Sequence, residues 1–318
     1  MGRADTATKN FMRQNDVFAD AFNFFLYQGY PVIDPGRLRE LNPAELAMPY
    51  GADQKSEPVQ KYRDILKGLT AMEDGKMAYL LLGIENQTHA HYAAPVKGML
   101  YDALQYARQV EQTGRKHREK KEHGRQGSGE FLAGFYKEDK LLPVLTLFIS
   151  FSPEEWDGPR SLAEMVGIKD EAVLARMPDY RINLVSPAEI GKEEFGKFHS
   201  ALGDVLEFIK YSGDKKKLVK WLYEEKPELT LGRREVEVLN ACVNAKLVIK
   251  PEEEEVKVCK AIEDYKMEAV EKATKEVTES TRLSDLRNLM KNMQLTAQQA
   301  AAALGLSPED TARLLEKL

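Results

Sequence analysis

Cysteine is scarce in this chain of 318 residues, and the two that occur, Cys242 and Cys259, have no CxxC spacing and no neighbouring histidines. This scarcity argues against a disulfide framework and against a zinc site. Long apolar runs are also missing, since the longest one, from Leu141 to Phe151, is far shorter than the roughly 20 residues of a membrane-spanning helix. The first thirty residues contain no uninterrupted apolar core. We therefore expect no secretory signal, no membrane partner and a cytoplasmic location.

An excess of positive charge is absent too, because 46 basic side chains are balanced by 51 acidic ones and the net charge is −5. This balance excludes a uniformly basic protein that coats nucleic acid, although it permits a local basic channel. Hydrophobic residues make up 43% of the chain and charged residues 31%, which is typical of a folded globular protein. The length favours about two domains.

Helical and extended patterns alternate in the first two thirds of the chain. Apolar residues at helical spacing predict two helices, and Pro95 is suited to the first turn of the second one. Two extended segments on either side of an Asp-Gly turn signal predict an antiparallel hairpin. The expected helices cover 15–28 and 96–110, and the expected strands cover 59–69, 77–87, 144–151 and 181–186.

From residue 187 to the end almost every segment has a helical pattern. We therefore expect an α/β (α+β) protein with a sheet-containing domain over residues 11–212 and a mainly helical C-terminal region over 213–318. Thr296 and Ser307 are suited to open two short helices in the tail.

Two acidic side chains and an amide are expected to converge on the hairpin. Asp64 is near the start of the first strand, and Glu85 and Gln87 share one face near the end of the second. Antiparallel pairing brings these two strand ends together. Carboxylates in half-buried strands are costly unless a cation pairs with them, so a metal site is an economical explanation. Hard oxygen ligands suit magnesium, which polarises a phosphate oxygen and activates water.

Four ordered motifs extend this observation. They are FADAFNFFLYQG (18–29), YRDIL (62–66), LLGIENQTHAHYAAPVKGMLYDALQY (81–106) and LLPVLTLFISFSPEEWDGPRSL (141–162). Together they resemble the recombination-promoting nuclease (Rpn, or YhgA-like putative transposase) family of the PD-(D/E)XK nuclease superfamily. The resemblance covers roughly residues 11–212 and, more loosely, the helical tail.

The resemblance implies a restriction-endonuclease-like αβββαβ core in residues 11–212. It implies that Asp64 and Glu85 are metal ligands and that Asp20 is the acidic contribution of the first helix. Gln87 occupies the place where the superfamily more often has lysine, and an amide there would orient water or a phosphate oxygen by hydrogen bonding. Lys97 is the nearest candidate for the missing cation, although the family more often has arginine at that position. The segment SFSPEEW also lacks the glycine that often precedes the tryptophan.

Each assignment has a plainer alternative. Asp64, Glu85 and Gln87 could form a polar edge of the sheet, and Asp20 could face solvent. The pair His89 and His91 has no third metal ligand at suitable spacing, which favours a structural or DNA-adjacent role.

A basic stretch over 114–129 has no apolar period, so we expect a mobile basic loop there. It is either a solvated loop or a set of contacts to DNA phosphates. The candidate phosphate contacts are Lys116, Arg118, Lys120 and Lys121.

The sequence thus predicts a magnesium-dependent DNA endonuclease that hydrolyses phosphodiester bonds, with manganese able to replace magnesium. The resemblance links this activity to recombination and mobile elements. The alternative is a non-catalytic DNA-binding or adaptor protein that keeps the fold, and the helical region could support a homo-oligomer.

Overall fold

The computed structural model describes residues 2–41, 44–47, 59–62, 64–70, 78–120 and 134–318. The chain forms two compact units, Met1–Glu255 and Val256–Leu318. The predicted division after residue 212 is therefore wrong, since it falls inside the first unit. The reason is packing: Trp221, Val238 and Leu239 are buried, and the Trp221 ring meets the ring of Phe208 edge-on at 6.2 Å.

A five-stranded sheet forms the centre of the first unit, in the order β1-β4-β5-β6-β7. The pairs β1/β4 and β4/β5 are antiparallel, and the pairs β5/β6 and β6/β7 are parallel. The predicted hairpin is thus confirmed in β4 and β5, and the expected mixed α/β class is confirmed as well. The strands are β1 (Leu38–Glu40), β4 (Ile65–Thr70), β5 (Ala78–Gln87), β6 (Val144–Ser150) and β7 (Asn183–Val185).

The first predicted strand of the hairpin is divided in the structure. Residues Val59–Tyr62 form β3, which pairs with β2 (Ala44–Ala47) in a separate two-stranded sheet. Asp64 lies at a bend directly before β4. Asp64 therefore lies at the end of the central sheet and not inside a strand.

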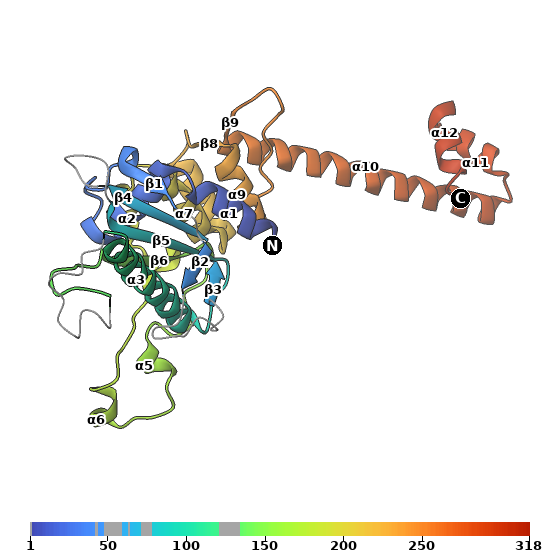
Figure 1. The fold of residues 1–318 in the computed structure, drawn as a ribbon. Helices are drawn as coiled ribbons and strands as arrows, with labels where there is room; N and C mark the ends of the chain where they lie inside the picture. Colours follow the sequence, from blue (N-terminus) through green and yellow to red (C-terminus); the bar gives the residue numbers. More distant parts are fainter. Residues whose placement is uncertain (1, 42–43, 48–58, 63, 71–77, 121–133) are drawn as a thin grey trace. The chain divides into compact units, whose positions relative to one another are not determined.

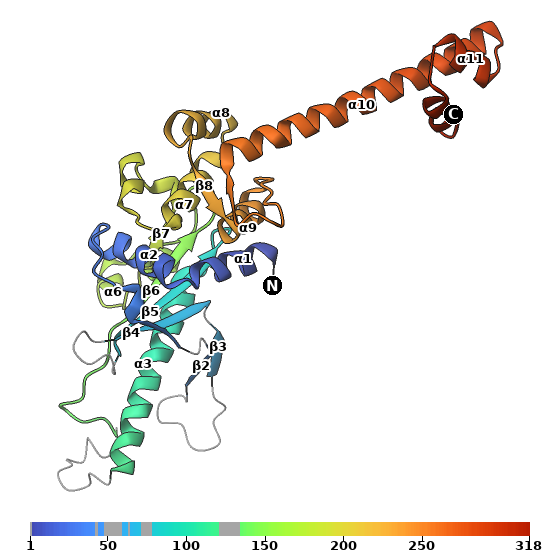
Figure 2. The same cartoon turned by 90° about the horizontal axis from the view of Figure 1, so that it is seen from above.

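Helices cover both faces of the central sheet (Figure 1). On one face lies α3 (Ala94–Glu119), which connects the parallel strands β5 and β6. Its Asp102 accepts a hydrogen bond of 2.5 Å from Thr146 of β6. On the other face lie α1 (Arg3–Met12) and α2 (Asn15–Tyr27), and Figure 2 shows the same arrangement from above.

The remaining segments of the first unit are mostly helical. Two helices of the C-terminal half, α7 and α9, pack against each other, and α9 also packs against α1. The bounds are η1 (Pro35–Arg37), α5 (Leu162–Met165), α6 (Glu171–Leu174), η3 (Pro187–Glu189), η4 (Lys192–Lys197), α7 (Ala201–Ser212), α8 (Lys215–Lys220), η5 (Trp221–Glu225), β8 (Thr230–Gly232) and α9 (Arg233–Val243). Strand β9 (Glu255–Lys257) contains the boundary between the two units.

Helix α3 is longer than its apolar stripe predicts. It continues to Glu119, so the prediction of a mobile loop from residue 114 is wrong for residues 114–119, and residues 121–129 lie outside the described part of the chain. Arginine, lysine and glutamate are good helix formers, and an ion pair of 2.9 Å joins Arg115 to Glu111 one turn earlier. His117 also anchors the helix end, because it bonds to Asp139 at 2.9 Å and stacks on Tyr136 at 3.8 Å.

The face of the sheet toward α1 and α2 contains a buried lysine. Lys67 is 1% exposed, and its ammonium donates hydrogen bonds of 2.6 Å to the carbonyl of Arg13 and to Oδ1 of Asn15. The same ammonium lies 4.8 Å from the centre of the Phe18 ring. Burial lowers the pKa of Lys67 to about 8. Lys67 therefore joins the sheet to the connection between α1 and α2.

This lowered pKa predicts a stability that rises in alkali. The unfolded chain binds more protons at Lys67 than the folded one between pH 8 and the ordinary lysine pKa, so folding becomes more favourable as the pH rises through that interval. We expect the free energy of unfolding of the wild type, relative to Lys67→Met, to increase by about 2–3 kcal/mol from pH 7 to pH 10.5. Urea unfolding of both proteins at several pH values measures this difference, and a pH-independent difference would contradict it.

The second unit consists of α10 (Val258–Met293), α11 (Ala297–Ala303) and α12 (Pro308–Leu315). Thr296 and Ser307 cap the two short helices, which confirms their predicted starts. Apolar contacts among Leu286, Ala300, Ala301 and Leu314 hold the three helices together.

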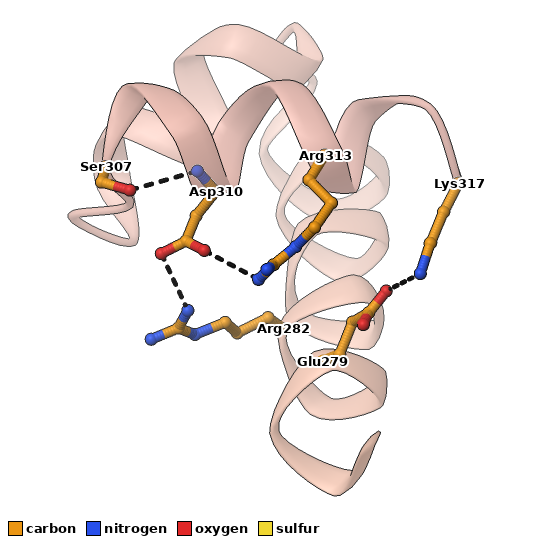
Figure 3. A network of polar contacts seen from close by, with 6 residues as sticks. All are labelled: Glu279, Arg282, Ser307, Asp310, Arg313 and Lys317. Atoms are coloured by element: carbon orange, nitrogen blue, oxygen red, sulfur yellow. Dashed lines mark hydrogen bonds and ion pairs between the residues drawn. The ribbon is translucent and has the colours of Figure 1, made fainter. Parts of the chain in front are cut away.

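Polar contacts reinforce this small core (Figure 3). Asp310 of α12 accepts from Arg282 of α10 at 3.3 Å and from Arg313 at 2.8 Å. Lys317 pairs with Glu279 of α10. These pairs fix α12 against α10. In the part of the chain that the structure describes, no helix has the length and apolar character to span a membrane.

Candidate active site

The end of the β4–β5 hairpin brings Asp64 and Glu85 together. The Asp64 amide N–H donates to Oε1 of Glu85 at 3.3 Å, and Oδ2 of Asp64 accepts from the Asn86 amide at 2.9 Å. Glu85 is 1% exposed. The predicted proximity of these two acidic residues is confirmed, and antiparallel register is its cause, because Ile65 pairs with Ile84 and places the preceding residue beside Glu85.

Lys97 supplies a cation to this pair of acids. It lies in the first turn of α3, and its ammonium is 2.6 Å from Oε2 of Glu85. The same ammonium lies 5.8 Å from the centre of the Tyr101 ring, one turn further along the helix. The helix that crosses from β5 to β6 thus places the positive charge beside the carboxylate that ends β5.

The environment of Asp64 raises the pKa of its carboxyl. Burial raises the pKa of this carboxyl above its ordinary value, while the Asn86 N–H and the charge of Lys97 act in the opposite direction. Asp5 and Lys9 of α1 also act on Asp64 electrostatically. The sequence analysis missed these two residues. The i, i+4 spacing of Asp5 and Lys9 indicates a pair within a helix, but no sequence pattern places that pair near Asp64.

Gln87 and Ser150 extend the site along the sheet. Gln87 of β5 is 8% exposed and pairs in parallel register with Ser150 of β6, which is 3% exposed. Neither side chain forms a hydrogen bond with any residue that the structure describes. The Gln87 carbonyl accepts from the Phe151 amide at 2.7 Å, which fixes the end of the strand. Gln87 therefore lies two residues beyond Glu85 on the same face, with its amide available.

Asp20 accepts four hydrogen bonds from three donor groups of its own. Its carboxylate accepts from the amides of His199 and Ser200 at 2.8–3.0 Å and from the Ser200 hydroxyl at 2.6 Å. These contacts attach α2 to the start of α7, which is a structural role. Metal binding by Asp20 stays a prediction, and it would require the carboxylate to be shared with these donors.

The predicted phosphate contacts lie at the far end of α3. Lys116 and Arg118 are exposed on its last turns, Lys120 follows directly, and Lys121 lies outside the described residues. A rise of 1.5 Å per residue places Lys116 roughly 28 Å along the helix from Lys97. That separation is close to one turn of duplex DNA, about 34 Å.

His89 and His91 lie in the connection between β5 and α3. His91 is exposed and its Nδ1 accepts from the Ala93 amide at 3.2 Å. Burial, followed by the charge of Lys97, lowers the pKa of His91. His91 therefore lies close to the site and helps to start α3.

The donor set at Asp64 and Glu85 fits a hard divalent cation. Among the residues that the structure describes, no group of three or more His, Cys, Asp or Glu side chains is suited to hold a metal. Magnesium, however, is commonly held by one or two carboxylates together with water and substrate phosphates. Burial raises the pKa of the Asp64 carboxyl, and a bound cation would act in the opposite direction by favouring its ionised form.

Comparison with known proteins finds no matching family model, no matching curated protein and no matching solved structure. The resemblance to the Rpn family thus stays a prediction from the quoted motifs.

Proposed function

We propose that this protein is a magnesium-dependent DNA endonuclease. The contact between Asp64 and Glu85 carries this proposal, because it joins two acids from neighbouring strand ends and adds Lys97 at 2.6 Å from the second one. A purely structural pair of carboxylates at this position would cost free energy through desolvation and repulsion. A site that accepts a cation and a phosphate gives these residues a function.

The order of elements around the acids supports the same function. Helix α2, the central-sheet strands β1, β4 and β5, helix α3 and strand β6 occur in the αβββαβ order that the resemblance implies, with the separate pair β2 and β3 inserted between β1 and β4. The acids lie at the end of β4–β5, and the lysine lies on the helix that follows. The connection of the site to recombination and mobile elements rests on the sequence resemblance alone.

Each residue has a definite task in this proposal. Asp64 and Glu85 would hold magnesium, which supplies Lewis acidity and a more acidic bound water. The Gln87 amide is suited to orient the attacking water or a phosphate oxygen, since it can both donate and accept. Lys97 balances the carboxylate of Glu85 and the negative charge that develops on the phosphate. Manganese is expected to replace magnesium.

Plasmid cutting tests the proposal. Purified protein should nick or cut supercoiled plasmid with magnesium or manganese and leave it intact in excess EDTA. Full cutting in excess chelator, or none under any metal condition, would refute it.

Replacement of Gln87 separates catalysis from binding. Gln87→Ala should lower the single-turnover cutting rate by about 10-fold or more, because an amide that orients the reacting groups acts mainly in the transition state. DNA affinity should stay near that of the wild type, since one neutral amide contributes little to phosphate attraction. Gel-shift titrations beside rapid-quench cleavage measure both quantities. If Gln87→Ala loses DNA affinity but keeps the single-turnover cutting rate, Gln87 acts in DNA binding and not in catalysis.

Charge reversal at the end of α3 tests DNA binding by this segment. Replacing Lys116, Arg118 and Lys120 by Glu should weaken binding to all sequences. It should also reduce the slope of log affinity against log salt by about 0.9 for each DNA phosphate that is no longer neutralised. The matched control reverses three exposed lysines of α8, namely Lys215, Lys216 and Lys217. An unchanged slope in the α3 variant would make this segment a solvated helix end.

One observation favours a second function. The ion pair between Lys97 and Glu85 neutralises the buried carboxylate without a metal, and Gln87 replaces a more common lysine. In a non-catalytic DNA-binding or adaptor protein, this ion pair alone would be sufficient to neutralise Glu85, and no metal would be required. The plasmid assay separates the two functions, because an adaptor binds DNA and leaves it uncut.

A further inference from the structure

A small pocket opens beside the candidate active site, at the carboxyl ends of the parallel strands β5 and β6. Its volume is about 170 Å³, close to that of an engineered cavity of about 150 Å³ that holds one benzene molecule. The pocket therefore has room for a single aromatic ring. The carboxyl ends of parallel strands are the usual place for ligands in sheets of this kind. Lining residues used below are Tyr92, Ser150, Glu154, Glu155, Trp156 and Asp157.

The deep side of the pocket offers an unused hydroxyl. Ser150 is 3% exposed, lines the pocket and forms no side-chain hydrogen bond with the described part of the chain. Its oxygen is not sealed among the buried atoms that lack a partner, so a ligand atom in the pocket can take the place of solvent as its hydrogen-bond partner. Ser150 is also the register partner of Gln87, so the pocket begins next to the proposed reaction site.

The rim of the pocket is acidic and aromatic. Glu154 and Glu155 are exposed, and neither pairs with a cation among the described residues. The Tyr92 hydroxyl donates to Asp157 at 2.8 Å, which fixes the exposed tyrosine ring at the edge of the pocket. Trp156 is packed into a cluster with Ala94 and Phe148 and gives the pocket a rigid wall. Free carboxylates repel phosphate and accept hydrogen bonds from amino groups.

We propose that this pocket takes one unstacked pyrimidine base with an exocyclic amino group, that is, cytosine, from the DNA strand beside the scissile phosphate. The Glu154 and Glu155 carboxylates accept from the amino group, Tyr92 provides a stacking surface and Ser150 bonds the inner edge of the ring. Thymine presents a carbonyl oxygen where the carboxylates need a donor, and purines have two rings. The proposal rests on the proposed function, since it names the substrate feature that the same site selects.

Binding of short single strands in EDTA tests this assignment in the wild type. Fluorescence anisotropy should show that a labelled decamer of deoxycytidine binds about 10-fold or more tightly than a decamer of thymidine. A decamer of N4,N4-dimethyldeoxycytidine should bind as weakly as the thymidine decamer, because it cannot donate from the amino nitrogen. Equal affinity for the three strands overturns the proposal.

A double variant assigns the preference to the rim. Glu154→Gln with Glu155→Gln should reduce the preference for deoxycytidine to less than about 3-fold. The control, Glu252→Gln with Glu253→Gln, changes two other adjacent exposed glutamates and should keep it. A preference that survives in the first variant overturns the proposal. A labelled tetra-arginine peptide tests the other occupant that an acidic rim could bind. If the decamers bind equally, and the peptide binds the wild type but not the first variant, the pocket binds a basic peptide and not a base.

The binding experiments and the plasmid assay can fail independently of each other. A preference for deoxycytidine in a protein that never cuts DNA supports the pocket and refutes the endonuclease. Cutting without any preference does the reverse.

Discussion

Glu85→Gln should cut DNA at least about 100-fold more slowly than the wild type while the fold is retained. The amide keeps the shape of the side chain and can still accept from the Asp64 N–H, but it loses the charge that a magnesium ion requires. Single-turnover nicking of plasmid DNA at saturating protein measures the loss, and circular dichroism confirms the fold.

Glu207→Gln is the matched control. Glu207 is also a buried glutamate, 4% exposed, with Lys226 at 3.8 Å, but it lies on α7. This variant should cut at the wild-type rate. Equal rates for the wild type and Glu85→Gln would remove Glu85 from the site.

Lys97→Met should lower the free energy of unfolding by about 2–3 kcal/mol. The substitution leaves the Glu85 carboxylate buried without its cation, and breaking a buried pair from one side typically costs about 3–5 kcal/mol. We expect the smaller loss of about 2–3 kcal/mol because the Lys97 side chain is 28% exposed, so water partly screens the pair. Urea unfolding at pH 7 without metal measures the change.

A double-mutant cycle isolates the pair. Lys97→Met combined with Glu85→Gln should recover most of the lost stability, since no unpaired charge remains, and should stay inactive. If the double variant is no more stable than Lys97→Met alone, the destabilisation arises from weaker packing of the lysine stem against Tyr101 and not from the charge.

The meeting of Asp64 and Glu85 could be predicted from the sequence because it depends on local rules. Alternating side chains, a turn signal and antiparallel pairing are sufficient to bring the start of one strand to the end of the next. The same holds for α3, which has Pro95 in its first turn, and for the strand β6 that follows it, since each has an apolar pattern of its own.

Long-range packing explains what could not be predicted. The basic end of α3 has no apolar stripe, and its helix depends in part on His117 meeting Asp139 and Tyr136, which are distant in sequence. The domain boundary predicted after residue 212 was wrong because Trp221 packs on α7, which no local pattern indicates.

The surroundings of Asp20 and of Asp64 also depend on contacts with residues that are distant in sequence. No local pattern shows that Asp20 accepts hydrogen bonds from the residue that caps a helix 180 residues away, or that Asp5 and Lys9 act on Asp64.

Calorimetric titration with manganese tests the central claim most directly, since that claim is a cation held between Asp64 and Glu85. The wild type should give a saturable heat of binding that disappears in Asp64→Asn and in Glu85→Gln, while Glu207→Gln binds like the wild type. Identical binding by the wild type and Asp64→Asn, or no binding by the wild type, would contradict the account.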